Sequence, residues 1–212
     1  MKPDQKLRRP RLIIGSILSV VFFFLAGMLL HSVIWGALAP GPDAAASQRN
    51  LTVLEEAYYV AEAISEGDYL RLGGYISDKG LLLVPFSTVD DGSLTFSAGE
   101  VRSFAATGEQ YLFGIDPATS QPIKLTPADY MTAYLRDVNY AEAPMLGVNN
   151  IVRRGNAVEN VTEAFPDGVF VDFFFPSSQP GGFDWKSLKV VFEEEGGRFR
   201  LVALIRGVYT DQ

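Results

Sequence analysis

The sequence predicts an α+β protein: an N-terminal transmembrane helix, then one outer domain of helices packed on a curved antiparallel sheet. Three observations lead to this class. Residues 12–38 carry no acidic or basic side chain apart from His31. This apolar segment is long enough for a bilayer-spanning helix. In the remainder, helical patterns come first and strand patterns dominate the second half. About 160 residues then remain, enough for one domain with its own core.

Charge and hydropathy divide the chain into four parts. We expect a basic cytoplasmic tail (1–11), a signal-anchor helix (12–38), a linker rich in Pro, Gly and Ala (39–48) and an extracytoplasmic domain (49–212). The tail holds five basic residues against Asp4, and basic residues before a span stay in the cytoplasm. These features predict a single-pass cell-membrane protein whose C-terminal domain lies outside.

A cleaved signal peptide is the alternative to a retained anchor. The apolar region of a signal peptide usually has about 7–15 residues, and this one is longer. The small-residue site at residues 37–39 is followed by Pro40, which fits a cleavage site poorly, and the site at residues 44–46 lies farther from the apolar run. Length therefore favours the anchor.

Composition excludes several kinds of chemistry. The chain has no cysteine, and its one histidine, His31, lies in the apolar segment. Disulfides, thiol catalysis and histidine-based triads or metal sites in the outer domain are therefore excluded, and we expect no metal and no cofactor. Residues 12–212 hold 13 basic residues (18 − 5) and 24 acidic ones (25 − 1), so we expect no nucleic-acid partner.

The first elements of the outer domain are helical. Apolar residues at helical spacing predict a helix over residues 51–66, which Gly67 ends, and Asp68 is placed to cap a second short helix. A strand is expected over residues 81–86. Two capping boxes, Ser97 to Glu100 and Thr126 to Asp129, predict the starts of two more helices.

Strands dominate the second half. Residues 111–115 and 122–125 flank a turn and are expected to pair, and GVNNIV and GVFVDFFF are expected to be further strands. The pair Gly196-Gly197 predicts a two-residue primed turn of a final hairpin. Its register would pair Glu195 with Arg198, Glu194 with Phe199, Glu193 with Arg200, Phe192 with Leu201, Val190 with Ala203 and Leu188 with Ile205, and would place Lys189 and Arg206 together on the face opposite the core.

Four residues are candidates for a site. Asp172 interrupts an aromatic strand, so burial could raise its pKa and make it a general base, although a solvated position or an ion pair is the more ordinary use. Lys189 and Arg206 could bind an anion or pair with Asp172. Tyr130 could contact a ligand, although a core position is the more common use of a tyrosine on a helical stripe.

Several blocks carry a resemblance to known proteins. ISDKGLLLVPFS, the segment around GVNNIVRRGN, and DWKSLKVVFEEEGGRFRLVALI resemble an uncharacterised family of bacterial secreted or membrane-attached proteins with GVN…IV…GN and DW-x-SL-x-L-V-F blocks. The helix-then-curved-sheet order is also similar to the NTF2-like (cystatin-like) superfold. That superfold hosts enzymes, binding modules and secretion-apparatus subunits, so the resemblance selects none of them.

The functional expectation is a membrane-anchored binding or assembly module that engages an envelope protein or a small ligand. The absence of cysteine and of a histidine in the outer domain favours a non-catalytic role. Two alternatives stay open. One is an NTF2-like enzyme that uses Asp172 as general base. The other is a subunit of a secretion or conjugation complex.

Overall fold

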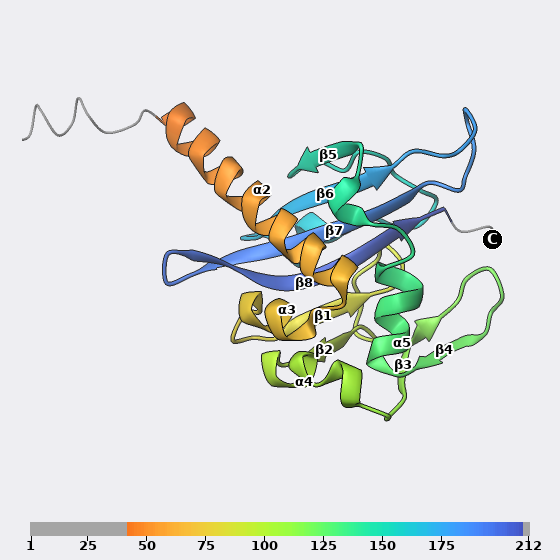
Figure 1. Cartoon of the computed structure of the whole chain (residues 1–212). Coiled ribbons are helices and arrows are strands. Elements are labelled where there is room, and N and C mark those ends of the chain that lie inside the picture. Colours follow the sequence, from red (N-terminus) through yellow and green to blue (C-terminus); the bar gives the residue numbers. More distant parts are fainter. Residues whose placement is uncertain (1–41, 210–212) are drawn as a thin grey trace, which may run out of the picture. The chain divides into compact units, whose positions relative to one another are not determined.

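The structure is a computed structural model that describes residues 42–209 (Figure 1). The chain divides into two compact units between Ser47 and Gln48, and the second unit contains the strands of the described residues. The predicted basic tail (1–11) and anchor helix (12–38) lie outside the described residues. Within residues 42–209, none of the helices has both the length and the apolar character needed to cross a membrane.

The first helix, α2 (Pro42–Glu66), begins earlier than predicted, so residues 42–48 of the predicted linker are helical. Its predicted end is confirmed: Gly67 follows with a φ of 68°, a conformation that glycine adopts at little cost. The Asp68 side chain then accepts a hydrogen bond from the Arg71 N–H and caps α3 (Tyr69–Tyr75), also as predicted.

Six strands form the main sheet in the order β2-β1-β8-β7-β6-β5. Their bounds are β1 (Leu81–Val84), β2 (Leu94–Phe96), β5 (Met145–Val148), β6 (Val169–Phe175), β7 (Lys186–Glu195) and β8 (Arg198–Val208). All neighbours are antiparallel except β1 and β8, which run parallel. These two strands lie far apart in the sequence, so no tight turn constrains their relative direction.

Shorter elements lie between β2 and β6. They are α4 (Ala98–Arg102), the 3₁₀ turns η1 (Phe104–Ala106) and η3 (Tyr140–Glu142), α5 (Pro127–Tyr130), the π-helical turn η2 (Met131–Leu135) and α6 (Val161–Ala164). The capping box at Ser97 is confirmed, and Thr126 caps α5 with Pro127 in its first turn. The predicted pair β3 (Tyr111–Ile115) and β4 (Pro122–Leu125) forms a separate hairpin.

The final hairpin confirms the predicted turn and corrects the register beyond it. Gly196 and Gly197 have φ values of 59° and 77°, as a primed turn requires, and pairing is as predicted up to Phe192 with Leu201. A β-bulge then intervenes, so Val191 pairs with Ala203 and Leu188 pairs with Arg206. The predicted pairings of Val190 and Leu188 are therefore wrong, because Val202 is the extra residue that shifts β8 by one.

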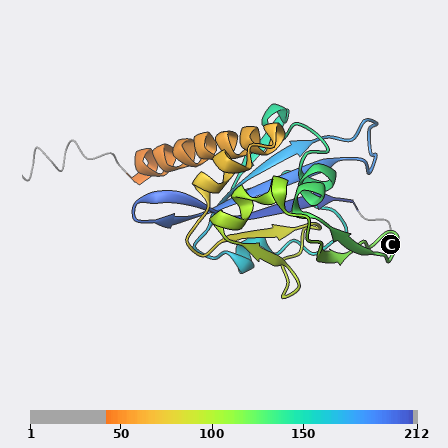
Figure 2. The same ribbon diagram turned by 60° about the horizontal axis from the view of Figure 1, so that its bottom comes forward.

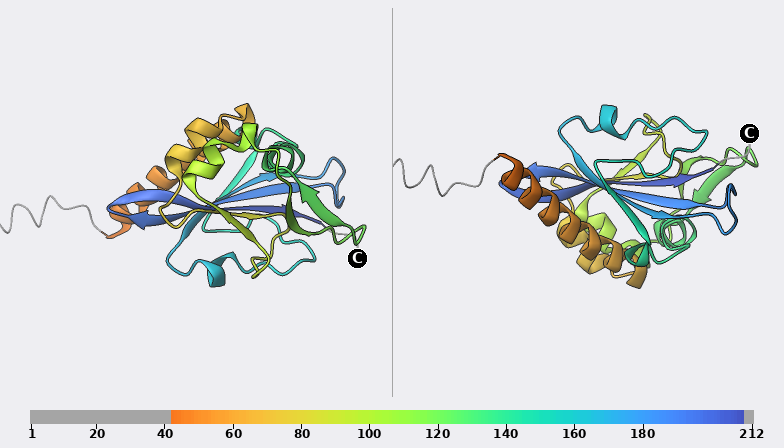
Figure 3. Two further views of the ribbon diagram at one scale, coloured as in Figure 1. Left: turned by 90° about the horizontal axis from the view of Figure 1, so that it is seen from below. Right: turned by 90° about the horizontal axis from the view of Figure 1, so that it is seen from above.

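Both faces of the sheet are covered (Figures 2 and 3). On one face the helices α2 to α5 pack over the main core, which includes Leu188, Val190, Phe192, Leu201 and Leu204. On the other face, the segment that contains α6 covers a smaller core, seen opposite the helices in Figure 3. This second core contains Val84, Val161, Phe170, Val191, Val202, Ala203 and Ile205. Ala203 and Ile205, predicted for the main core, belong to the second one.

Candidate functional site

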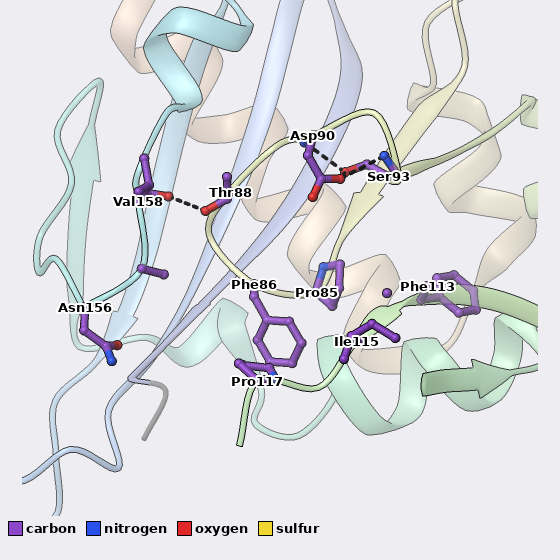
Figure 4. A pocket seen from close by; sticks show the side chains of 13 residues that line it. Pro85, Phe86, Thr88, Asp90, Ser93, Phe113, Ile115, Pro117, Asn156 and Val158 are labelled. Carbon is purple, nitrogen blue, oxygen red and sulfur yellow. Dashed lines mark hydrogen bonds between the residues drawn. The ribbon is translucent and has the colours of Figure 1, made fainter. Parts of the chain in front are cut away.

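An open pocket of about 690 Å³ lies where three loops meet (Figure 4). The loop after β1 forms one wall, the end of β3 and the turn after it form a second, and residues 156–158 form the third. The lining residues are Pro85, Phe86, Thr88, Asp90, Gly92, Ser93, Phe113, Gly114, Ile115, Pro117, Asn156, Ala157 and Val158. The volume falls in the range of small-molecule sites, about 300–1,000 Å³.

The pocket lining is mixed, with apolar side chains beside the polar residues Thr88, Asp90, Ser93 and Asn156. Two apolar side chains that line it, Ile115 and Val158, are 56% and 69% exposed, so they present apolar surface to a ligand. Among the described residues that line the pocket, Asp90 is the one that ionises. Its Oδ1 accepts hydrogen bonds from Gly92 N and Ser93 Oγ, which fixes the turn that carries it (Figure 4).

A stack of aromatic rings supports the wall that Phe113 forms. Phe113 stacks on Tyr130 with ring centroids 3.9 Å apart, and Tyr130 stacks on Tyr134 at 5.1 Å. The guanidinium of Arg206 lies over the Tyr134 ring at 5.4 Å and closes the stack. The candidate residues Tyr130 and Arg206 therefore lie behind the pocket wall and do not line it.

Tyr130 is a core residue, and its buried hydroxyl lowers the stability of the fold. The side chain is fully buried, and its Oη has no hydrogen-bond partner among residues 42–209. Burial raises the pKa of Tyr130 far above its ordinary value, so the hydroxyl stays protonated. A buried hydroxyl without a partner costs about 1–3 kcal/mol.

Replacing Tyr130 by phenylalanine is therefore expected to leave the fold at least as stable as before. The ring keeps its stacking on Phe113 and Tyr134, while the unpartnered hydroxyl is lost. We expect the free energy of unfolding to rise by about 1 kcal/mol, measured by urea denaturation. A loss of 1 kcal/mol or more would show that the hydroxyl has a stabilising partner.

Arg206 belongs to an ionic group on the helix-covered face of the sheet. Its Nη2 lies 3.0 Å from Asp137 Oδ2, which also lies 3.1 Å from Lys186 Nζ. The Tyr140 hydroxyl donates to Asp137 Oδ1 at 3.1 Å. The prediction that Arg206 shares a face with Lys189 is wrong, because the bulge turns the Arg206 side chain to the face of Leu188.

Lys189 and Asp172 meet on the opposite face of the sheet, in a buried ionic cluster. The two residues are directly opposed on β7 and β6, and both are fully buried. Lys189 Nζ lies 2.9 Å from Glu159 Oε2, and these side chains are 0% and 1% exposed. Asp172 accepts hydrogen bonds from Ser187 Oγ at 2.6 Å and from Val152 N at 2.9 Å. Sequence reasoning placed Lys189 and Asp172 together but missed Glu159, which lies in an irregular segment without periodicity.

Asp172 lies in a buried, hydrogen-bonded environment. Burial raises the pKa of this carboxyl, and the charge of Lys189 opposes that rise. Both carboxylate oxygens accept hydrogen bonds within the fold, and the residue does not line the pocket of Figure 4. Lys189 lies opposite Asp172 in the strand register, but its ion pair is with Glu159.

The raised pKa of Asp172 predicts a pH dependence of stability. A carboxyl whose pKa is higher in the folded state takes up a proton on folding, so it favours the folded state at low pH. This contribution is lost as pH rises above about 3.9, the ordinary value for aspartate, and through the raised pKa of the folded state. We expect the unfolding free energy of the native protein, relative to that of Asp172→Asn, to fall as pH rises above about 4. A difference that rises with pH would contradict the direction of the shift.

No site for a metal is formed by the described residues: nowhere within 42–209 do three or more His, Asp or Glu side chains gather in a way that could hold an ion.

Comparison with known proteins assigns no family. No family model matches the chain, and no curated protein matches it. Among solved structures, a DUF4783 family protein from Bacteroides ovatus is similar with 11% identity, 72% of this chain, 94% of that chain and a TM-score of 0.31. A putative calcium/calmodulin dependent protein kinase II association domain from Xanthomonas campestris is similar with 12% identity, 82% and 93% coverage, and a TM-score of 0.34. TM-scores this low carry no argument about this chain, so the α+β architecture rests on its own strand pairing.

Proposed function

We propose that the outer domain is a non-catalytic binding module whose ligand enters the pocket of Figure 4. The observation that carries the proposal is the open pocket of about 690 Å³ with exposed apolar side chains at Ile115 and Val158. Exposed apolar surface in a concave site is typical of a binding surface. Enclosing an apolar group there would remove this surface from water, which supplies the binding energy.

The charge around the pocket favours a ligand with a cationic group. Asp90 supplies a negative charge at the pocket, and the lining contains no positive charge among the described residues. Residues 12–212 hold 24 acidic and 13 basic side chains, so the domain attracts cations over longer distances. The ligand class is therefore an apolar or aromatic body that ends in an amine or guanidinium, as in a peptide segment or a small molecule.

The setting of the module is part of the same proposal. The helix-first order and the helices on one sheet face support an NTF2-like (cystatin-like) domain of the bacterial family whose sequence blocks it resembles. The apolar segment 12–38 and the basic residues before it support a single-pass anchor that displays the domain outside the cell membrane. An envelope protein that inserts an apolar, basic segment is then a suitable partner.

The enzyme alternative has less support. Asp172 is the acid that such an enzyme would use as general base, and a base must reach the substrate proton within about 3.2 Å or through one water. The Asp172 carboxylate is fully buried, and Ser187, Val152 and Lys189 surround it. The secretion-complex alternative remains compatible with a binding module and is tested by co-purification with other membrane proteins.

Two matched compounds test the proposal on the full-length protein. Phenylpropylamine and phenylpropionate share an apolar body and differ in the sign of their charge. We expect the amine to bind more tightly, by roughly two- to fivefold, as an exposed charge pair allows. Asp90→Asn should remove this preference. Binding is measured by ligand-detected NMR.

A matched pair of variants locates the binding. Ile115 lines the pocket and is 56% exposed, whereas Leu112 of the same strand is 53% exposed and does not line it. Ile115→Ser should weaken binding of the amine about tenfold through loss of apolar contact, and Leu112→Ser should leave it unchanged. Equal effects of the two changes, or no binding of either compound, would argue against this pocket.

A further inference from the structure

Hydrogen bonds join two of the three pocket walls. Ser87 Oγ donates to Glu159 Oε1 at 2.9 Å, and Thr88 Oγ1 donates to the Val158 carbonyl at 2.6 Å. The Asn160 side chain makes two hydrogen bonds to the backbone of Val89: it accepts from the N–H at 2.8 Å and donates to the carbonyl at 2.9 Å. The loop after β1 and the segment around Glu159 are therefore one connected unit, although about 70 residues of chain separate them.

This unit is fastened to the sheet below it. Glu159 pairs with Lys189 of β7 at 2.9 Å, and the Ser87 N–H donates to the Arg206 carbonyl of β8 at 2.8 Å. Glu159 thus uses one carboxylate oxygen for Lys189 and the other for Ser87. Its side chain is 1% exposed, so water competes little for either contact.

We propose that the Glu159–Lys189 pair is a latch that holds these two pocket walls together and so sets the opening of the pocket. Stability of the fold alone does not require such a pair, because apolar residues of similar volume often serve as well in a core. An apolar residue at position 159 has no atom to accept the Ser87 hydroxyl. The carboxylate therefore does what an apolar replacement does not: it connects Lys189 of the sheet to Ser87 of the loop after β1.

The latch makes Glu159, Lys189 and Ser87 positioning residues. None of the three lines the pocket, yet two of them adjoin residues that do: Glu159 follows Val158, and Ser87 lies between Phe86 and Thr88. Asp172 lies opposite Lys189 on β6, and Ser187, two residues before Lys189 on β7, donates a hydrogen bond to Asp172. The significance of the latch for ligand binding rests on the proposed function, but its test does not.

Hydrogen–deuterium exchange of the full-length protein tests the latch without any ligand. Ser87→Ala removes only the link to the loop. The double variant Glu159→Leu/Lys189→Met removes both partners of the pair, and Asp172, which stays buried beside them, can then take up a proton. Both should speed exchange at the amides of residues 87–90 and 158–160 by about tenfold, the equivalent of one buried hydrogen bond to a charged group. Glu163→Gln, an exposed change in α6, is the control and should alter nothing.

The location of the faster exchange decides whether the latch is supported. Faster exchange confined to the two wall segments, with β6, β7 and β8 unchanged, supports the latch. Unchanged walls in both variants would overturn it, and so would an equal acceleration over the whole domain, which would show that the pair acts on global stability. Binding of phenylpropylamine by the native protein is measured separately. A failure of the proposed function therefore appears there and leaves the exchange result intact.

Discussion

Replacing Lys189 by methionine is expected to lower the free energy of unfolding by about 3–5 kcal/mol, the cost of leaving a buried charge without its partner. Lys189 is fully buried between Glu159, which it contacts at 2.9 Å, and Asp172, which opposes it on β6. Without the ammonium group, two carboxyl groups share one apolar face of the sheet. At least one of them must then take up a proton to remain buried.

Lys79 provides the matched control for this change. It also pairs with a glutamate, Glu193, but its side chain is 70% exposed. Lys79→Met should cost at most about 1 kcal/mol, as for other surface pairs. Adding Glu159→Leu to Lys189→Met should recover a large part of the loss, because it removes one of the unpaired charges. Equal losses for Lys189→Met and Lys79→Met in urea denaturation would contradict the buried cluster.

Replacing Phe113 by alanine is expected to cost about 3–5 kcal/mol, as for other buried phenylalanines. Phe113 is 2% exposed and lies between Phe96, at 6.2 Å, and Tyr130, at 3.9 Å. Its removal leaves a cavity in the stack, and a cavity that cannot collapse adds to the loss of contacts. Because Phe113 also lines the pocket, the amine should bind more weakly as well.

Phe183 is the matched control for the second change. It stacks on Tyr209 with ring centroids 4.1 Å apart, but it is 56% exposed. Phe183→Ala loses one ring contact and little burial, so it should cost less than about 1.5 kcal/mol. A Phe113→Ala variant that unfolds at the same urea concentration as Phe183→Ala would show that the stack contributes little to the core.

Local signals in the sequence predicted the local structure well. Both capping sites and the glycine turn at residues 196–197 depend on residues within one turn of each other, and all three are present. The bulge at Val202 was missed, because the run Leu201 to Ile205 is apolar throughout and fits either register. That single residue reversed the face of Arg206 and divided the predicted core in two.

The candidate site was harder to predict for a physical reason. The pocket is built from three loops that are distant in sequence, and their meeting depends on tertiary contacts such as Asn160 with Val89. Glu159 carries no periodic or motif signal of its own. One clue was present: a lysine within the apolar run of residues 188–192 requires a buried carboxylate partner. The sequence suggested Asp172 as this partner, and the structure shows that Lys189 forms its ion pair with Glu159.

The most direct test of the binding proposal uses the absence of cysteine from the chain, which makes any introduced thiol unique. Val158→Cys places a thiol at the pocket, and Leu70→Cys places one at a matched surface position, since the two residues are 69% and 71% exposed. Each full-length variant is exposed to a panel of apolar, cationic and anionic disulfide fragments under partly reducing conditions, and captured fragments are identified by mass.

We expect Val158→Cys to select aromatic fragments with an amine over anionic ones by about two- to fivefold, the preference that one exposed charge pair allows. Leu70→Cys should show no such selection. The same capture profile at both positions would contradict the central claim that this pocket binds a ligand.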